Sequence, residues 1–270
     1  MLTPAPAGAA DAPLAVAPGV VWGARPDLTP LAALPLLVLV GVTGVGKSTT
    51  VEALRETGPA FGLLPDRRVV TDRAIMARYA GGPVADRIER FRITARFRAE
   101  VPGGMAAVLA GLHLDPAILP PPLLFDGLRG AEEAVHAAAA LPLARFAVLT
   151  APDALRLRRL LGRADPFDTA GAPAAGGADF AEYADVLDAA ERGRLAAAVA
   201  AGQVAAAAVR EKLAIIAEER RSYDPDAAAI ALLRVAPDRT VVVDTARHDP
   251  QAAAALIAPL LRRATAGVPR

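Results

Sequence analysis

The feature that most constrains this chain is a continuous apolar segment that runs directly into a glycine-rich turn. Residues Leu36 to Val40 carry no polar side chain, which predicts a strand buried on both faces of a parallel sheet. The segment Gly41 to Ser48 then fits the pattern G-x-x-x-x-G-K-[ST]. A helix is expected to follow and to end at Gly58 and Pro59, a glycine before a helix breaker.

This pattern is that of a P-loop, and the residue types explain what it binds. Glycines leave room for successive backbone N–H groups to converge on phosphate oxygens. We expect Lys47 to reach the β- and γ-phosphates of ATP and the hydroxyl of Ser48 to ligate Mg²⁺. The alternative is a chance match in a chain rich in glycine and alanine, although Lys47 is one of only two lysines. The expected ATP-binding residues are Gly41, Thr43, Gly44, Val45, Gly46, Lys47, Ser48 and Thr49.

Charge and composition exclude several classes of protein. The 270 residues include 30 Lys and Arg against 29 Asp and Glu, so the chain lacks the overall basic field that favours nucleic-acid binding. Cysteine is absent, which removes disulfides and thiolate metal sites and is consistent with a cytoplasmic protein. No apolar run approaches the roughly 20 residues of a membrane span, so we expect a soluble protein with no membrane partner.

Composition along the chain predicts four segments. Residues 1–35 are rich in alanine and proline and read as a disordered or surface-draped leader, although Val20 to Trp22 could pin part of it onto the domain. Residues 36–164 would form the first part of an α/β core, and 239–270 would complete it with a last strand and helix. Between them, residues 165–238 read as a helical insertion, either a lid that closes over substrate or an interaction arm through which the chain could oligomerise.

Two further segments suggest ligands for substrate and metal. Residues 67–73 predict a short strand, and Asp72 and Arg73 at its carboxyl end are candidates for holding a second substrate. The alternative is that Asp72 caps a helix. Residues 123–129 predict a buried strand carrying Asp126, the arrangement of a Walker B carboxylate near Mg²⁺. Aspartates at strand ends are, however, common in α/β proteins.

The order of these parts resembles the P-loop nucleoside and nucleotide kinases, a family that includes adenylate kinase-like and dephospho-coenzyme A kinase-like enzymes. Leu124 to Arg129 is similar to the strand and Asp-Gly-x-x-Arg turn of that family, with the arginine one residue earlier than in that turn. Residues 147–153, followed by Arg159 and Arg163, resemble the strand and helix that lead into its lid. The resemblance implies a three-layer α/β P-loop NTPase sandwich with a mainly parallel sheet and a helical lid-like insertion.

The resemblance also implies roles for individual residues. Arg159 and Arg163 match the pair that contacts the transferring phosphates, and Arg129 is a candidate for the second substrate. Residues four apart share one helical face, and planar guanidinium groups suit phosphoryl oxygens; the alternative is that both arginines are surface charges. The expected catalytic residues are Lys47, Arg159, Arg163 and Asp126.

These expectations favour an ATP·Mg²⁺-dependent phosphotransferase acting on a small-molecule acceptor, either a nucleotide or another anionic metabolite. A second hypothesis is an NTPase switch or assembly module, in which ATP drives a conformational change. A third is a nucleotide-binding scaffold without turnover. The sequence does not identify the acceptor.

Overall fold

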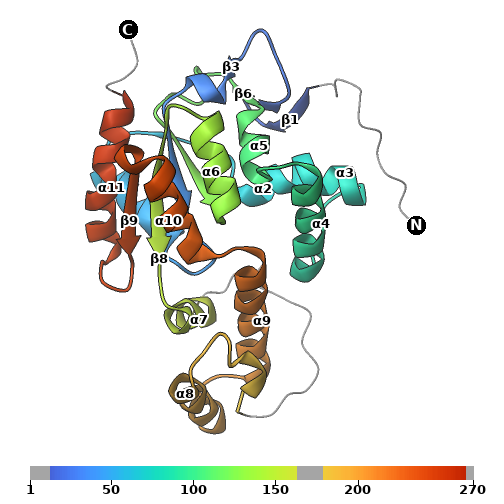
Figure 1. Cartoon of the computed structure of the whole chain (residues 1–270), viewed down its shortest axis with the longest axis vertical. Coiled ribbons are helices and arrows are strands. Elements are labelled where there is room, and N and C mark those ends of the chain that lie inside the picture. The colour runs from blue at the N-terminus through green and yellow to red at the C-terminus, as the bar shows by residue number, and fades with distance from the viewer. Residues whose placement is uncertain (1–12, 163–178, 266–270) are drawn as a thin grey trace.

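The core of the protein is a parallel five-stranded sheet in a computed structural model that describes residues 13–162 and 179–265 (Figure 1). Its strand order is β5-β7-β4-β8-β9, and all four neighbouring pairs are parallel. The fold is therefore α/β with a parallel sheet, as the sequence predicts. The strands are β4 (Leu36–Val40), β5 (Gly62–Leu63), β7 (Leu123–Leu128), β8 (Ala144–Thr150) and β9 (Thr240–Asp244).

Both faces of this sheet are covered by helices, so the side chains of β4 contribute to two hydrophobic cores. Leu36, Val38 and Val40 pack into one hydrophobic cluster, whereas Leu37 and Leu39 pack into the other, as expected from the alternation of side chains along a strand. The first cluster includes residues of α5 (Met105–Ala110), α6 (Ala131–Ala140) and α10 (Pro225–Val235). The second includes residues of α1 (Lys47–Thr57) and α11 (Pro250–Thr265).

The expectation of a disordered or surface-draped leader is wrong for residues 14–30. They form β1 (Leu14–Ala17), β2 (Val20–Trp22) and β3 (Thr29–Pro30), which join β6 (Leu112–Leu114) in an antiparallel sheet of order β1-β2-β6-β3. The physical reason is that Val16 and Val20 are buried in the same cluster as Leu36. A short 3₁₀ turn, η1 (Leu31–Ala33), leads into β4, and residues 1–12 lie outside the described part of the chain.

The strand predicted over residues 67–73 is also wrong, because this segment is helical. The carboxylate of Asp66 accepts a hydrogen bond of 2.8 Å from the Val69 N–H and caps the start of α2 (Arg67–Thr71). The helix continues through a π-helical turn, η2 (Asp72–Met76), and α3 (Ala77–Ala80). After residues 81–86 the chain forms α4 (Arg87–Glu100).

A separate helical body lies beyond the lower end of the sheet in Figure 1. It comprises α7 (Asp153–Leu161), the turn η3 (Ala181–Tyr183), α8 (Ala189–Ala200) and α9 (Ala206–Ser222), and it has its own hydrophobic cluster. Part of the predicted insertion lies outside the described residues. Its last part does not belong to this body, because α10 packs against α6 and β8, followed by the turn η4 (Pro237–Arg239).

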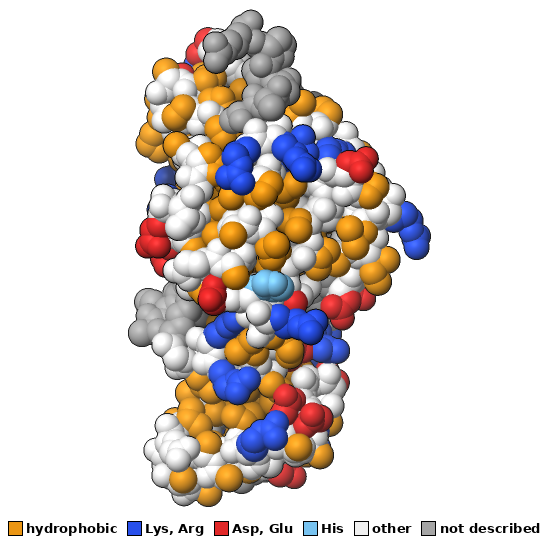
Figure 2. All heavy atoms as spheres, turned by 90° about the vertical axis from the view of Figure 1, so that its left-hand side faces the viewer, with side chains coloured by type: hydrophobic (Ala, Val, Ile, Leu, Met, Phe, Trp, Pro, Cys, Tyr) orange, Lys and Arg blue, Asp and Glu red, His pale blue; other side chains and the backbone are white. Residues whose placement is uncertain are grey.

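The strand β9 lies at one edge of the sheet, between α10 and α11. Figure 2 looks onto this side of the molecule and shows hydrophobic side chains gathered in its middle.

In residues 13–162 and 179–265, no helix has the length and apolarity that crossing a membrane requires.

Candidate active site

A cavity of about 830 Å³ opens beyond the carboxyl ends of the central strands. The strand β7 pairs with one side of β4, and β8, the next strand along the chain, pairs with the other side. Ligands of open α/β sheets collect at such a reversal of strand order. The cavity is lined by the loop after β4, by α2 and α4, by the turn after β7, and by Arg159 and Tyr223.

The loop after β4 has the backbone that its glycines allow. Gly41, Gly44 and Gly46 have φ angles of 155°, 84° and 95°, which residues with a Cβ rarely adopt. A Cβ at Gly41 would lie 2.8 Å from the Leu149 carbonyl oxygen, and one at Gly44 would lie 3.1 Å from the Arg156 carbonyl oxygen. Gly46 is the N-cap of α1 and supplies no side-chain cap, so the positive end of that helix meets the cavity without an internal anion.

The amine of Lys47 lies inside the curve of this loop. Its Nζ donates to the carbonyl oxygens of Gly41 at 3.0 Å and Val42 at 3.2 Å, and it lies 3.8 Å from Oδ1 of Asp126. Burial lowers the pKa of Lys47 below its usual value, and the Asp126 carboxylate only partly offsets this effect. A buried cation with so few anionic neighbours favours the binding of an anion.

The carboxylate of Asp126 is the second unusual group. Its Oδ1 is buried and is the one such side-chain oxygen in the described part of the chain without a hydrogen-bond partner. The register between β4 and β7 shifts at this point, so that Leu39 lies opposite Asp126 while Val40 lies opposite Leu128. Ser48 lines the same cavity. A carboxylate and a hydroxyl are hard oxygen ligands suited to Mg²⁺, which takes its remaining ligands from water and phosphate.

Groups of three or more metal-binding side chains are absent from residues 13–162 and 179–265. A Mg²⁺ site of the nucleotide-dependent kind does not need such a group, because one or two carboxylates suffice. Asp126 and Ser48 therefore fit this type of site better than a cage made only of protein ligands.

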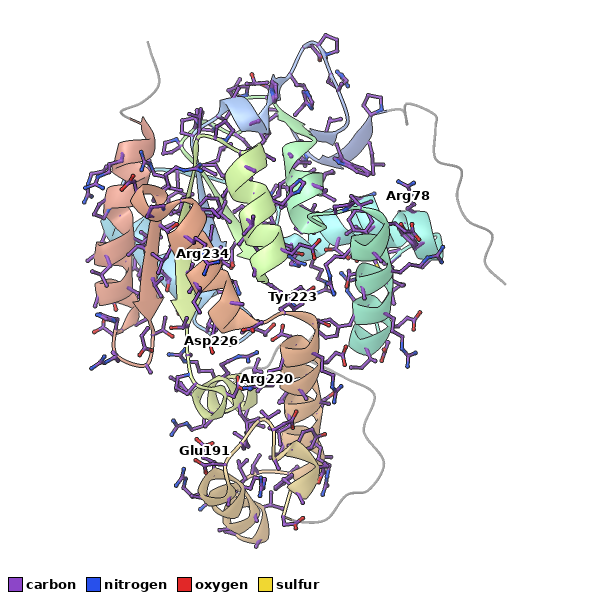
Figure 3. The ribbon with its side chains drawn as sticks, in the orientation of Figure 1. Arg78, Glu191, Arg220, Tyr223, Asp226 and Arg234 are labelled. Atoms are coloured by element: carbon purple, nitrogen blue, oxygen red, sulfur yellow. The ribbon has the colours of Figure 1, made fainter. Side chains whose placement is uncertain are left out.

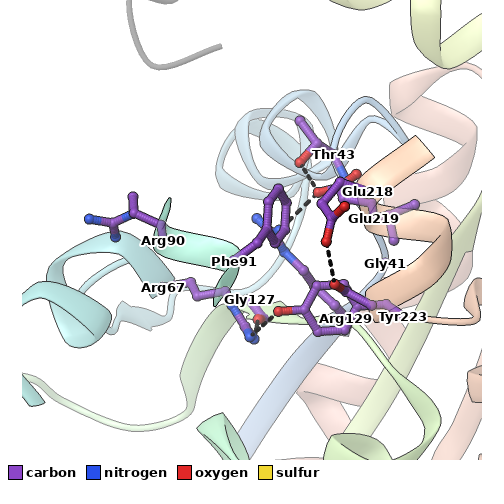
Figure 4. Close-up of polar contacts among 12 residues, drawn as sticks. Gly41, Thr43, Arg67, Arg90, Phe91, Gly127, Arg129, Glu218, Glu219 and Tyr223 are labelled. Atoms are coloured by element: carbon purple, nitrogen blue, oxygen red, sulfur yellow. Dashed lines mark hydrogen bonds and ion pairs between the residues drawn. The ribbon is translucent and has the colours of Figure 1, made fainter. Parts of the chain in front are cut away.

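A buried carboxylate of the helical body forms hydrogen bonds with the loop after β4. Glu219 of α9 is fully buried and accepts hydrogen bonds from the Thr43 N–H at 3.1 Å and the Thr43 hydroxyl at 2.5 Å (Figure 4). The same carboxylate pairs with Arg129 at 2.8 Å and with Arg156 at 2.5 Å. Thr43 and Arg129 line the cavity whereas Glu219 does not, so the carboxylate positions the groups that form the wall.

Arg156 of α7 bonds a second helix of the helical body to the same loop. Its Nε donates to the Thr43 carbonyl oxygen at 2.8 Å, and its remaining nitrogens pair with Glu219 and Asp153 at 2.5 Å each. Arg220 of α9 also pairs with Asp153, and Figure 3 shows Arg220 on the side of α9 that faces α7. Both α7 and α9 are therefore bonded to the loop and to each other.

A second buried network surrounds Tyr223, at the junction between the helical body and the core (Figure 3). Arg67 makes a bidentate pair with Glu133 at 2.7 Å and also donates to the Gly127 carbonyl and the Tyr223 hydroxyl. Burial alone would raise the pKa of Glu133, but the Arg67 guanidinium more than offsets this, so the pKa lies below its usual value. The guanidinium groups of Arg67, Arg98 and Arg129 lie within 6 Å of the Tyr223 ring.

The structure separates the two residues predicted to hold a second substrate from the cavity wall. Asp72 and Arg73 do not line the cavity, since they lie in a helix and not at a strand end. Asp72 pairs instead with Arg90, which does line the cavity, while Arg73 is exposed. The residues of this segment that reach the cavity are Asp66, Arg67, Arg68 and Thr71.

The predicted arginines after β8 have different positions. Arg159 lines the cavity and donates to the Gly44 carbonyl at 3.1 Å and to the hydroxyl and carbonyl oxygens of Thr245 at 2.9 and 2.8 Å. Burial and the neighbouring Arg158 lower the pKa of Arg159. Arg163 lies outside the described residues. Arg129, predicted for the substrate, lines the cavity as described above.

The charges around the cavity favour a polyanion. Its wall contains two aspartates, Asp66 and Asp126, and a larger number of cationic side chains. These cationic residues are Lys47, Arg67, Arg68, Arg90, Arg129 and Arg159.

Sequence reasoning missed Glu219, Glu133 and Tyr223. The segment Glu218-Glu219-Arg220-Arg221 has the appearance of a solvated charge run, and only its tertiary contacts distinguish Glu219.

The sequence matches no family model and has no significant match among proteins with curated descriptions.

Proposed function

We propose that this chain is an ATP·Mg²⁺-dependent phosphotransferase built on a P-loop NTPase core. The observation that carries the proposal is the pairing of a desolvated amine with an unsatisfied carboxylate at a glycine loop. Lys47 Nζ and Asp126 Oδ1 lie 3.8 Å apart, and both border the cavity. A triphosphate would supply further negative charge to Lys47, and Mg²⁺ would bind the Asp126 oxygen that accepts no hydrogen bond.

Each residue of the loop then has a defined task. The backbone N–H groups from Gly44 to Thr49, at the start of α1, would bind phosphate oxygens. Lys47 would neutralise the β- and γ-phosphates, and Asp126 with Ser48 would hold Mg²⁺. When bound, Mg²⁺ would offset charge on the phosphate oxygens during transfer.

The acceptor is proposed to be a small anionic molecule. Arg68, Arg90 and Arg129 line the cavity, and guanidinium groups bind carboxylate and phosphate oxygens with two parallel hydrogen bonds. Arg159 would stabilise charge at the loop, and the same role is proposed for Arg163. Asp72 would act on the acceptor only through Arg90, with which it pairs.

A transfer assay with γ-labelled ATP and pooled small metabolites tests this function. Lys47→Ala is expected to abolish label transfer, and Lys212→Ala is a matched control because Lys212 is the only other lysine and lies on α9. Label in an organic acceptor supports the phosphotransferase. Tight ATP binding without transfer or hydrolysis over a broad acceptor panel would contradict it and favour a scaffold.

One observation favours the alternative of an NTPase switch. Glu219 and Arg156 bond the helical body directly to Thr43. A movement of the loop on nucleotide binding would therefore shift α7 and α9 as well. Hydrolysis that does not depend on any acceptor, together with a change in proteolytic cleavage of α8 on ATP binding, would support the switch. Turnover that rises with one acceptor would support the phosphotransferase instead.

A further inference from the structure

The outer edge of β9 has backbone groups that the fold leaves unused. Thr245 N–H donates to the Thr150 carbonyl at 3.0 Å, and β9 runs parallel to β8 with Val242 opposite Val148. Because alternate residues of an edge strand bond to its neighbour, residues 241 and 243 face β8. The backbone groups of Thr240, Val242 and Asp244 therefore face away from the sheet.

Two of these six outward groups are already bonded within the chain. The Thr240 N–H donates to the Pro237 carbonyl, and the Asp244 carbonyl accepts from the N–H groups of Arg247 and His248 at 3.1 Å. The remaining four are the Thr240 carbonyl, both groups of Val242 and the Asp244 N–H. No hydrogen bond to these four occurs among residues 13–162 and 179–265.

These four groups match the requirements of a second copy of the same strand. In an antiparallel pair centred on Val242, the two Val242 residues would exchange two hydrogen bonds. Each Asp244 N–H would donate to the Thr240 carbonyl of the other copy, which gives two more. The Thr240 N–H and Asp244 carbonyl, which would lie opposite each other, are the two groups already satisfied internally. The leftover hydrogen-bonding groups of this edge are therefore self-complementary.

Exposed apolar side chains gather at the same edge. Of the ten large hydrophobic residues that are exposed in the described part of the chain, five lie on α10, β9 and α11. Ile230 is the most exposed of the ten, at 61%. Figure 2 shows hydrophobic side chains across the middle of this face. The five residues are Ile230, Leu233, Val235, Val242 and Leu256.

The charges at the two ends of β9 would also be complementary in such an antiparallel pair. Arg145, Arg239 and Arg263 gather at the amino end, where burial and then the charges of Arg263 and Arg239 lower the pKa of Arg145. The carboxyl end carries Asp244 and Asp249. An antiparallel pair places the amino end of one strand beside the carboxyl end of the other. Each end also carries one residue of the other sign, Asp238 at the amino end of β9 and Arg247 at its carboxyl end.

We propose that two copies of this chain form a two-fold symmetric dimer by antiparallel pairing of their β9 strands, flanked by the exposed faces of α10 and α11. A two-fold interface uses the same surface on both copies, which is what the hydrogen-bond pattern and the charges require. The pairing would join two five-stranded sheets into one of ten strands and would cover an open edge that otherwise invites non-specific association. This surface does not include the helical body formed by α7, η3, α8 and α9.

Sedimentation equilibrium over a concentration series tests the dimer. The full chain is expected to reach twice the monomer mass of 27.7 kDa. Val242→Lys would place two like charges at the symmetry axis and is expected to raise the dissociation constant at least about tenfold. The matched control is Ile118→Lys, at a residue that is 55% exposed far from β9 in the sequence, which should leave the constant unchanged. A wild-type chain that stays monomeric at concentrations on the order of 100 µM would overturn the proposal.

A cross-linking experiment keeps the test independent of the folding of the lysine variant. The chain contains no cysteine, so Val242→Cys introduces a single thiol at the proposed axis. The two α-carbons of a hydrogen-bonded antiparallel pair lie about 5.5 Å apart, within the range of a disulfide. Mild oxidation is expected to give a covalent dimer of Val242→Cys and little of Ile118→Cys. Equal amounts of dimer from both variants would overturn the proposal.

Discussion

Replacing Glu219 by glutamine should destabilise the whole protein, although the change removes only one charge. The Glu219 carboxylate accepts from four donors, two on Thr43 and one each on Arg129 and Arg156. Glutamine keeps the size of the side chain but turns an NH₂ group toward at least one of these donors. Arg156, whose side chain is 1% exposed, would then keep Asp153 as its remaining carboxylate.

The size of the effect follows from the burial of the pair. Breaking a buried ion pair by removing one partner costs about 3–5 kcal/mol, because the other charge stays out of water. A change of 1 kcal/mol shifts the melting temperature of a domain of this size class by about 2–4 °C. We therefore expect Glu219→Gln to lower the melting temperature by roughly 6–20 °C and to lower the free energy of unfolding in guanidinium titrations accordingly.

The neighbouring residue on α9 is the matched control. Glu218 pairs with Arg221, whose side chain is 68% exposed, so Glu218→Gln should cost less than about 1 kcal/mol. A double variant, Glu219→Leu with Arg156→Leu, should lose less than the sum of the two single variants, since it leaves no unpaired charge between them. Equal losses for Glu219→Gln and Glu218→Gln would refute the reasoning.

Three other predictions concern the site. The pKa of Glu133 is lowered in the folded protein, so its stabilising effect is present above the unfolded value of about 4.3 and is lost as the pH falls through the folded pKa. Urea midpoints of Glu133→Gln should therefore change less with pH below about 4.3 than those of the wild type. The lowered pKa of Lys47 makes its amine neutral at a lower pH than an ordinary lysine, and ATP·Mg²⁺ at ten times its dissociation constant should slow amine labelling of Lys47 about tenfold. Mass spectrometry would follow both lysines, and equal protection of Lys212 would contradict the site assignment. Because Asp126 Oδ1 has no hydrogen-bond partner, Asp126→Asn should reduce the gain in ATP affinity caused by Mg²⁺ at least about tenfold while leaving Mg²⁺-free binding nearly unchanged. Calorimetry with and without Mg²⁺ measures this, and an unchanged gain would exclude Asp126 as a ligand.

The parts of the fold with strong local signals could be predicted from sequence. The segment from Leu36 to Thr57 is a buried strand, a glycine loop and a helix, as predicted, because each residue type there is dictated by local geometry. The strand that carries Asp126 is predicted from its apolar run, and a last strand is predicted within residues 239–270, where β9 lies. In these elements local preference and tertiary burial agree.

The failures occurred where tertiary contacts decide the structure. Val69 and Val70 suggested a strand, but the capping carboxylate of Asp66 and the burial of Val70 on one helical face favour α2. The antiparallel sheet at the amino end was missed because β1 and β2 are short, and β2 pairs with β6, which lies about 90 residues later. Glu219 could not be found for a similar reason, since its partners on the loop are distant in sequence.

The distance between Thr43 and Glu219 has a consequence for how the protein is made. The two residues are separated by 176 positions, so the ribosome completes the loop long before its supporting carboxylate exists. At typical rates of 5–20 residues per second, this interval is roughly 10–35 s. During that time a nascent chain carries the glycine loop without the buried network that holds Thr43 and Arg129 in place. The finished cavity wall is therefore a late product of translation, and a chain truncated before α9 would contain the whole phosphate-binding motif without it.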